Sequence, residues 1–233
     1  MVMESSDLGN TWTTPKPLVE GDIGGRGPVR NKPIILKDGT WAAPASIEGD
    51  VWDAFVDLSK DQGATWTASN LVPVQHASLV ANQSDMEGLP LTASSFKGKG
   101  VIQPTLWESE HGNVHMLLRS SEGYIYRSDS DDGGSSWCHA YKTNLPNNNS
   151  GIDLTKRDDG SLWLVYNPVS GNWAPRTPLV ASSSHDNGLT WKQEFILEDE
   201  QGEYSYPAIV SMGNKLFITY TWNRKRIVFC KSN

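Results

Sequence analysis

Aspartates at a fixed spacing are the first residues in this sequence that could carry acid–base or metal chemistry. They recur in an eight-residue motif, S-x-D-x-G-x-[TS]-W, whose four aspartates are Asp7, Asp61, Asp132 and Asp186. An aspartate at this position can accept backbone N–H groups of a tight turn. The glycine adopts a conformation that other residues resist, and the tryptophan ring can cover the turn. The motif therefore predicts four stapled hairpin turns rather than four acids or metal ligands.

The histidines and cysteines give no support for a metal site. Five histidines are present and predict no ligand set; they are His76, His111, His115, His139 and His185. Cys138 and Cys230 fit neither a zinc spacing nor a disulfide framework, so we interpret both as free thiols. We expect no metal and no cofactor.

The charge balance narrows the classes of partner. The 233 residues include 27 acidic and 20 Lys and Arg side chains, a net charge of −7 with a pI near 5.2. A nucleic-acid binder would normally show a basic face, and no stretch approaches the roughly 18 apolar residues of a membrane helix. Residues 1–12 lack the basic and apolar regions of a leader. If Met1 is the natural start, we expect a cytoplasmic protein with neither nucleic acid nor membrane as a partner.

Short apolar segments must position whatever site the chain carries. They alternate, are rich in β-branched and aromatic residues, and lie between Gly, Asn, Asp and Pro; examples are 52–58, 114–118, 162–166 and 216–220. This pattern is typical of strands. No window shows a helical period over three turns, so we predict an all-β chain.

A second repeated theme places a glycine turn between two strands, at 37–41, 110–114, 158–162 and 212–216. Together with the aspartate motif it defines a four-stranded unit, which is typical of a β-propeller blade. Inner strands are expected to begin near Pro33, Pro104, Ile152 and Tyr206. Residues 1–20 supply only a motif and an outer strand, and residues 204–233 give three strands without a motif. We therefore expect one domain over 1–233, with about four to five blades and an abridged N-terminal blade.

The repeats resemble the Asp-boxes, or BNR repeats, of sialidases (neuraminidases). The resemblance covers nearly the whole chain and is similar to bacterial sialidase-like propellers in the segments QPTLWE, PNNNSGID, RTPL and EYSYPAI. It implies a six-bladed propeller with its site at the central axis. In that family three arginines bind the substrate carboxylate, a Tyr–Glu pair forms the nucleophile, and an Asp is the acid/base.

Transferring these roles residue by residue gives a partial set. The resemblance implies that Arg119 and Arg176 bind a sugar carboxylate, for which the planar guanidinium offers two parallel hydrogen bonds. It implies Tyr204 as the site tyrosine, with Gln103 where the family has its Glu. The family's first arginine and its acid Asp belong to an N-terminal blade for which the sequence suggests no counterpart.

Gln103, in place of the family's Glu, affects whether the site tyrosine can act as a nucleophile. A tyrosine hydroxyl has a pKa of about 10 and needs a base before it can attack. The Gln103 amide can hydrogen-bond the hydroxyl but cannot take its proton, so Glu203, Glu108 or Asp153 would have to reach the site. We expect Asn149 and Asp153 to contact the substrate.

Three functions remain open on this reading. The first is a sialidase-like glycoside hydrolase that removes terminal sialic acid or another acidic sugar, with Tyr204 and Gln103 as its catalytic residues. The second is a propeller that binds acidic carbohydrates without catalysis. The third is a uronic-acid hydrolase or polysaccharide lyase on the same scaffold, because a fold does not fix a function.

Overall fold

The computed structural model describes residues 1–22, 29–75 and 98–232. In these ranges the regular elements are fifteen strands, as the all-β prediction requires. The same ranges contain no helix with the length and apolar character needed to cross a membrane.

The strands form four units, which we number blades 1 to 4 in chain order. Blade 1 comprises β1 (Ile34–Ile35), β2 (Trp41–Glu48), β3 (Val51–Ser59) and β4 (Thr67–Ala68). Blade 2 comprises β5 (Lys99–Glu108), β6 (Val114–Ser120), β7 (Tyr124–Ser130) and β8 (Tyr141–Pro146). Blade 3 comprises β9 (Asp153–Lys156), β10 (Leu162–Tyr166), β11 (Leu179–Ser184) and β12 (Lys192–Glu198). Blade 4 comprises β13 (Tyr204–Met212), β14 (Lys215–Trp222) and β15 (Arg226–Lys231).

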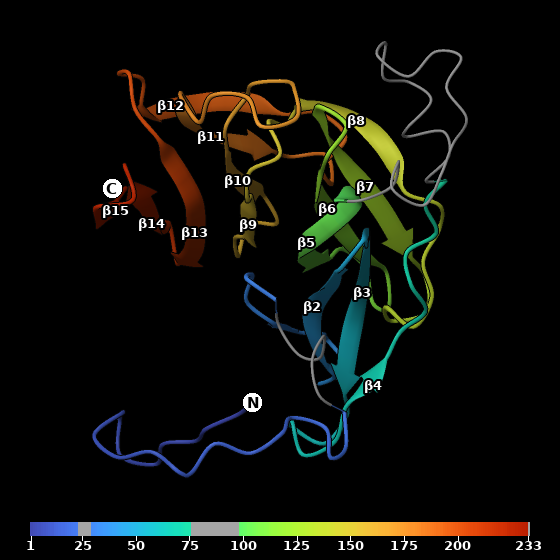
Figure 1. The fold of residues 1–233 in the computed structure, drawn as a ribbon. Coiled ribbons are helices and arrows are strands. Elements are labelled where there is room, and N and C mark those ends of the chain that lie inside the picture. Colours follow the sequence, from blue (N-terminus) through green and yellow to red (C-terminus); the bar gives the residue numbers. More distant parts are fainter. Residues whose placement is uncertain (23–28, 76–97, 233) are drawn as a thin grey trace.

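The blades follow one another along an arc with their inner strands facing a shared axis (Figure 1). Consecutive strands within a blade are antiparallel. One parallel pairing, Val51 with Lys99 and Trp52 with Gly100, links blade 1 to blade 2. Along the arc, β2 contacts β5, β5 contacts β9, and β9 contacts β13. Three four-stranded units followed by a three-stranded one is the organisation predicted from the repeats, and it confirms the propeller prediction.

The hydrophobic cores lie between the blades. The first core combines Leu36 and Val56 of blade 1 with Leu106 and Met116 of blade 2. A second core joins blades 2 and 3, and a third joins blades 3 and 4. Each strand alternates its side chains between the two faces of its blade, so blades 2 and 3 contribute to two cores each. This packing fixes where each inner strand begins and therefore where its first side chains lie.

The Asp-boxes form the predicted stapled turns. In the box of blade 3, Ser184 Oγ donates to Asp186 Oδ1 over 2.8 Å, and Thr190 donates through its backbone N to Oδ1 and through its hydroxyl to Oδ2. The Trp191 indole N–H donates to the Gly188 carbonyl over 3.1 Å. The other three boxes repeat the serine and threonine (or serine) contacts to their aspartates. These aspartates are therefore structural.

The first box lies in an N-terminal arm, residues 1–22, that extends away from the blades (Figure 1). Val2 N donates to the Lys16 carbonyl over 2.8 Å, which pairs the two sides of the box. The Trp12 side chain is 58% exposed, whereas Trp137 in the box of blade 2 is 6% exposed. The box hydrogen bonds thus form whether or not a core covers the tryptophan.

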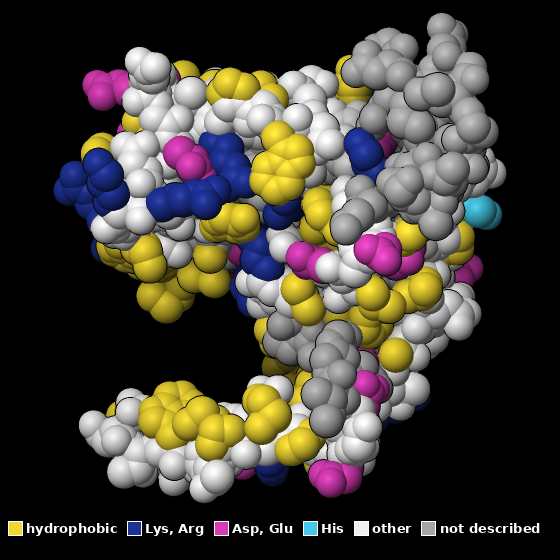
Figure 2. Space-filling view, in the orientation of Figure 1, with side chains coloured by type: hydrophobic (Ala, Val, Ile, Leu, Met, Phe, Trp, Pro, Cys, Tyr) yellow, Lys and Arg dark blue, Asp and Glu magenta, His cyan; other side chains and the backbone are white. Residues whose placement is uncertain are grey.

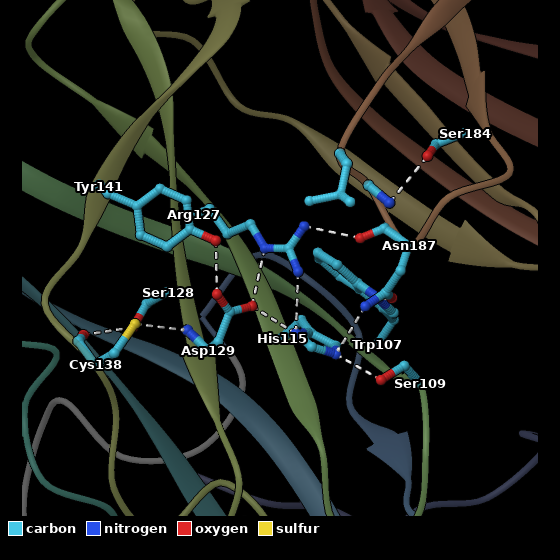
Figure 3. A network of polar contacts seen from close by, with 12 residues as sticks. Trp107, Ser109, His115, Arg127, Ser128, Asp129, Cys138, Tyr141, Ser184 and Asn187 are labelled. Atoms are coloured by element: carbon cyan, nitrogen blue, oxygen red, sulfur yellow. Dashed lines mark hydrogen bonds and ion pairs between the residues drawn. The ribbon is translucent and has the colours of Figure 1, made fainter.

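A polar network connects blade 2 to the box turn of blade 3 (Figure 3). Arg127 Nη1 donates to the Asn187 carbonyl over 2.8 Å, and the Trp107 indole N–H donates to Asn187 Oδ1 over 2.7 Å. His115 stacks on Trp107, with ring centroids 5.0 Å apart. The network ties the outer part of one blade to the turn of the next.

Asp129 is the charged centre of this network. His115 Nδ1 lies 2.5 Å from Asp129 Oδ1, Arg127 Nε donates to the same oxygen over 2.9 Å, and the Tyr141 hydroxyl donates to Oδ2 over 2.6 Å. Burial acts to raise the pKa of Asp129, but these hydrogen bonds lower it to about 2. The aspartate is therefore held ionised between its donors.

Candidate active site

Each blade has one strained residue that lies within its inner strand or a few residues before it. Four non-glycine residues there have positive φ angles: Arg30 (69°), Gln103 (52°), Asn149 (56°) and Tyr206 (51°). Such conformations are disfavoured by about 1–3 kcal/mol each and concentrate at functional sites. Two of them, Gln103 and Tyr206, precede prolines inside β-bulges of β5 and β13. The recurrence in all four blades indicates a site built at the axis.

Three guanidinium groups surround one of these residues, Tyr206. The Cζ atom of Arg176 lies 5.1 Å from the centre of the Tyr206 ring, and Cζ of Arg30 lies 5.6 Å from it. Arg176 and Arg119 both act on the Tyr206 hydroxyl, chiefly through their positive charges. The Tyr206 side chain is 41% exposed, so solvent reaches it. We call Arg30, Arg119, Arg176 and Tyr206 the arginine–tyrosine site.

The arginines change the acidity of this phenol. Burial acts to raise the pKa of Tyr206, but the positive charges of Arg176 and Arg119, with their hydrogen bonds, bring it below its ordinary value of 10. A phenol with a lowered pKa forms its nucleophilic anion more readily. The same charges would attract an anionic ligand.

Arg119 contacts two other residues that the sequence predicted for the site. Its Nε donates to Asn149 Oδ1 over 2.8 Å and its Nη1 donates to Gln103 Oε1 over 3.0 Å. The Arg119 guanidinium also lies over the Trp52 ring, 5.7 Å from its centre. Gln103 and Asn149 therefore orient a predicted carboxylate-binding arginine.

Arg176 enters the site from the segment between β10 and β11. Its Nη1 donates to Glu203 Oε1 over 3.1 Å, and Arg224 Nε donates to the same oxygen over 2.8 Å. Burial acts to raise the pKa of Glu203, but the two arginines lower it overall. Glu203 is therefore a carboxylate where it pairs with Arg176. Because its pKa is lowered, this carboxylate is a poor proton acceptor.

Arg30 was not identified from the sequence. Its guanidinium donates to the carbonyls of Ile152 and Pro207, so it bridges blades 3 and 4 from the start of blade 1. Its close approach requires Gly151, where a Cβ would lie 2.3 Å from Arg30 Nε. Burial lowers the pKa of Arg30 to about 10. Arg30 could have been identified from the sequence only by its position just before Pro33, where an inner strand was predicted.

Glu48 is a carboxylate that sequence analysis also missed. It is the last residue of β2 and is exposed. Its Oε1 accepts hydrogen bonds from Gln103 Nε2 over 3.0 Å and from Ser46 Oγ over 2.9 Å. Because Gln103 also accepts from Arg119, one side chain separates this acid from the arginine–tyrosine site.

The Tyr204 backbone N donates to the Arg176 carbonyl over 2.9 Å, but the Tyr204 side chain lies in the core and not among the guanidinium groups, contrary to the expectation. Its side chain is 2% exposed and packs in the core between blades 3 and 4, with its ring centre 6.5 Å from that of Trp222. In a regular strand, residues two apart share a face. The bulge between Ser205 and Ala208, with the positive φ of Tyr206, breaks that rule. The tyrosine among the arginines is therefore Tyr206.

Asp153 also lies elsewhere than expected, in the interior beneath the site. It is 2% exposed, and its carboxylate accepts hydrogen bonds from Lys32 Nζ, the Thr105 hydroxyl and Ile209 N over 2.8, 2.9 and 2.9 Å. These donors come from blades 1, 2 and 4. Asp153 thus holds the inner strands together. Glu108, the other carboxylate considered, accepts from Lys37 N and Gly112 N at the outer turns.

The donor chemistry of the site suits an organic anion. In the described residues, no three His, Cys, Asp or Glu side chains gather as a metal site would require. The arginine–tyrosine site instead offers three cations, one acidic phenol and amide groups. A carboxylate matches the planar fork of arginine.

Solved structures share this fold. The Hadza microbial sialidase Hz136 matches with a TM-score of 0.72 at 19% identity, over 99% of this chain and 43% of that one. A mutant of the NanB sialidase of Streptococcus pneumoniae matches with a TM-score of 0.67 at 17% identity, over 94% and 32%. A protein of unknown function from Dyadobacter fermentans matches with a TM-score of 0.67 at 18% identity, over 95% and 59%.

This chain therefore spans from about a third to three fifths of the length of these structures. At such identities the likeness extends to the fold, which is that of a sialidase-type propeller. A family model described as a BNR repeat-like domain matches residues 1–218. With its Asp-boxes, its blades and this match, the chain belongs to the BNR repeat-like domain family.

Proposed function

We propose that this chain is a glycoside hydrolase that acts on a terminal acidic sugar, such as a sialic acid. The observation that carries the proposal is the convergence of Arg30, Arg119 and Arg176 on the exposed ring of Tyr206. A sugar carboxylate held by Arg119 and Arg176 through charge-assisted hydrogen bonds would be fixed beside the phenol.

Tyr206 is the proposed nucleophile. Its oxygen would form a bond to the anomeric carbon while the bond from that carbon to the leaving oxygen breaks. The lowered pKa of Tyr206 supports this role, because the phenolate is the attacking form. Water would later replace the phenolate at the same carbon and restore the free enzyme.

Glu48 is the proposed proton carrier. As a carboxylic acid it would protonate the leaving oxygen, and as a carboxylate it would take a proton from the incoming water. Its hydrogen bond to Gln103 supports this placement. Gln103 would then be a positioning residue that aligns Glu48 and Arg119, a change from the catalytic role expected from sequence.

A second candidate function is binding of acidic sugars without turnover. The observation that favours it is Gln103 itself, since an amide at this position cannot exchange a proton with the phenol. Both functions require Arg119 and Arg176, so they differ only in product formation.

The deciding experiment measures sugar release from sialyl and uronyl glycosides, alongside calorimetric binding of the free acids. Loss of a charged hydrogen bond in a buried site should lower kcat/KM by about 30-fold or more in Arg176→Ala. The matched control is Arg157→Ala, because Arg157 donates to the Asn214 carbonyl at an exposed turn. Binding without release would support the second candidate. If the protein neither binds the free acids nor releases sugar, both candidate functions are excluded.

A further inference from the structure

Ser109, His115 and Asp129 form a hydrogen-bonded chain in blade 2 (Figure 3). Ser109 Oγ lies 2.7 Å from His115 Nε2, and His115 Nδ1 lies 2.5 Å from Asp129 Oδ1. Ser109 directly follows β5, whereas Gln103 lies near the start of that strand. At a rise of about 3.3 Å per residue the two residues are roughly 15–20 Å apart. The chain is therefore separate from the arginine–tyrosine site, and the proposed sugar hydrolysis uses none of its groups.

The neighbours of His115 determine which ring nitrogen carries the hydrogen. The Trp107 indole N–H donates to Asn187 Oδ1 over 2.7 Å, so the Nδ2 group of Asn187 faces His115 Nε2, 3.3 Å away. Because an amide nitrogen only donates, Nε2 is the acceptor. The hydrogen of the neutral ring is then on Nδ1, where Asp129 accepts it, and the Ser109 hydroxyl donates to Nε2. His115 thus has the tautomer and the orientation of a general base for this serine.

Asp129 supplies the negative charge that a histidine base needs when it takes up a proton. Arg127 Nη2 lies 3.2 Å from His115 Nδ1, and its positive charge opposes an imidazolium ion. The carboxylate of Asp129 compensates, since it contacts both the ring and the Arg127 Nε. The Tyr141 hydroxyl holds its second oxygen over 2.6 Å. The third member of the chain is therefore fixed in place and ionised.

Solvent reaches this part of blade 2. A surface cavity of about 460 Å³ is lined by His115, Asp129 and Asn113, among others. The Asn113 carbonyl accepts a hydrogen bond from Ser109 N over 3.0 Å, so the cavity borders the turn that carries the serine. Ser109 itself is half-buried. A small molecule can thus approach the serine and the histidine from the same side.

The turn after Ser109 also offers groups that could bind a carbonyl oxygen. The Gly112 N–H donates to Glu108 Oε1 over 3.0 Å. In the part of the chain that the structure describes, the backbone N–H groups of Glu110 and His111 donate to no protein acceptor. Donors beside a nucleophilic serine stabilise the negative charge that develops on the carbonyl oxygen during attack. Two such groups directly follow this serine.

From this geometry we infer a second activity, in which Ser109, His115 and Asp129 hydrolyse small acyl esters such as acetylated alcohols. Ser109 Oγ bonds to the acyl carbon while its proton passes to His115 Nε2. The bond from that carbon to the alcohol oxygen breaks, and the alcohol leaves with the proton from Nε2. Water then attacks the acyl-serine and gives a proton to Nε2. That proton returns to Oγ as the carboxylic acid departs.

The two activities are independent of each other. They share no residue, and their substrates differ in charge. On the face shown in Figure 2, Lys and Arg side chains gather over blades 3 and 4, which suits an anionic sugar. The acyl ester is neutral, and its site is built from blade 2 and the box turn of blade 3. Failure of either proposal therefore leaves the other intact.

Covalent labelling with an alkyl fluorophosphonate tests the inference. An activated serine oxygen bonds to phosphorus and displaces fluoride, whereas an ordinary serine does not react. Peptide mass mapping of the labelled wild type should place the adduct on Ser109. Hydrolysis of 4-nitrophenyl acetate should fall by about 100-fold or more, or to the background rate, in Ser109→Ala. Asp129→Asn and His115→Gln should each slow the labelling of Ser109 about tenfold or more.

The matched control is Ser5→Ala, because the Ser5 hydroxyl is also half-buried but donates to the carboxylate of Asp7 with no histidine beside it. Its labelling and ester hydrolysis should equal those of wild type. An unlabelled Ser109 in the wild type would overturn the inference, whatever the folding of the variants. Equal labelling rates in wild type and folded His115→Gln would also overturn it, by showing that the histidine contact is only structural.

Discussion

The guanidinium of Arg176 lies over the ring of Tyr206, 5.1 Å from its centre. One residue comes from the loop after β10 and the other from the bulge at the start of β13, so the contact exists only when blades 3 and 4 are packed. In the proposed function, Arg176 would hold the sugar carboxylate and Tyr206 would attack the adjacent carbon.

Removing one hydroxyl group at a time shows which of Tyr206 and Tyr204 is needed for catalysis. Tyr206→Phe keeps the ring beneath Arg176 and removes the hydroxyl of the proposed nucleophile, so kcat should fall by about 100-fold or more with little change in KM. Tyr204→Phe is the matched control, because its ring belongs to the core, and its kcat should stay within a fewfold of wild type. Steady-state kinetics on a sialyl glycoside measures both. A loss of kcat in Tyr204→Phe alone would return the role to Tyr204.

The acidity of Tyr206 gives a test that needs no substrate. Arg176 and Arg119 stabilise the phenolate, so Tyr206 should ionise below pH 10 in the wild type. Ultraviolet difference titration of wild type against Tyr206→Phe isolates this group. In Arg176→Ala one stabilising charge is gone and the titration should move to higher pH. An unchanged titration would mean that the charge of Arg176 does not act on the phenol.

Gly151 should tolerate no side chain because Arg30 occupies the space. A Cβ there would meet Arg30 Nε at 2.3 Å, whereas a Cβ at Gly160 meets nothing within 4 Å and is opposed only by a φ of +84°. We expect Gly151→Ala to lower the free energy of unfolding by about 2–3 kcal/mol and Gly160→Ala by about 1 kcal/mol. Urea denaturation measures both. Equal effects would show that Arg30 moves aside without loss.

The parts of this fold that depend on short-range chemistry are predictable from sequence. The box contacts of Asp186 with Ser184 and Thr190 span at most four residues, so the motif alone specifies the turn. Arg119 contacts Gln103 on the adjacent strand of its own blade and Asn149 at the start of the next blade, so three residues predicted for the site lie together, while their roles stay predictions.

The remaining site residues depend on long-range packing. A bulge moves the site tyrosine from Tyr204 to Tyr206, and bulges leave little trace in the residue pattern. Arg30 reaches the site through contacts with Ile152 and Pro207, more than a hundred residues away. Glu48 is placed through Gln103 on another blade. None of these contacts can be inferred from spacing along the chain.

The Asp-boxes should make stability depend on acid in a defined range. The Thr190 hydroxyl and backbone N–H, as the largest causes, lower the pKa of Asp186 from 3.8 to about 2. Because the folded pKa lies below the unfolded one, this stabilisation is complete above about pH 4 and is lost as the pH falls toward 2. Urea denaturation across this range should show falling stability in the wild type. Thr190→Val removes the hydroxyl donor, raises the folded pKa and should make the slope shallower. An equally steep slope in Thr190→Val would mean that other carboxylates, with Asp129 foremost, set the acid response.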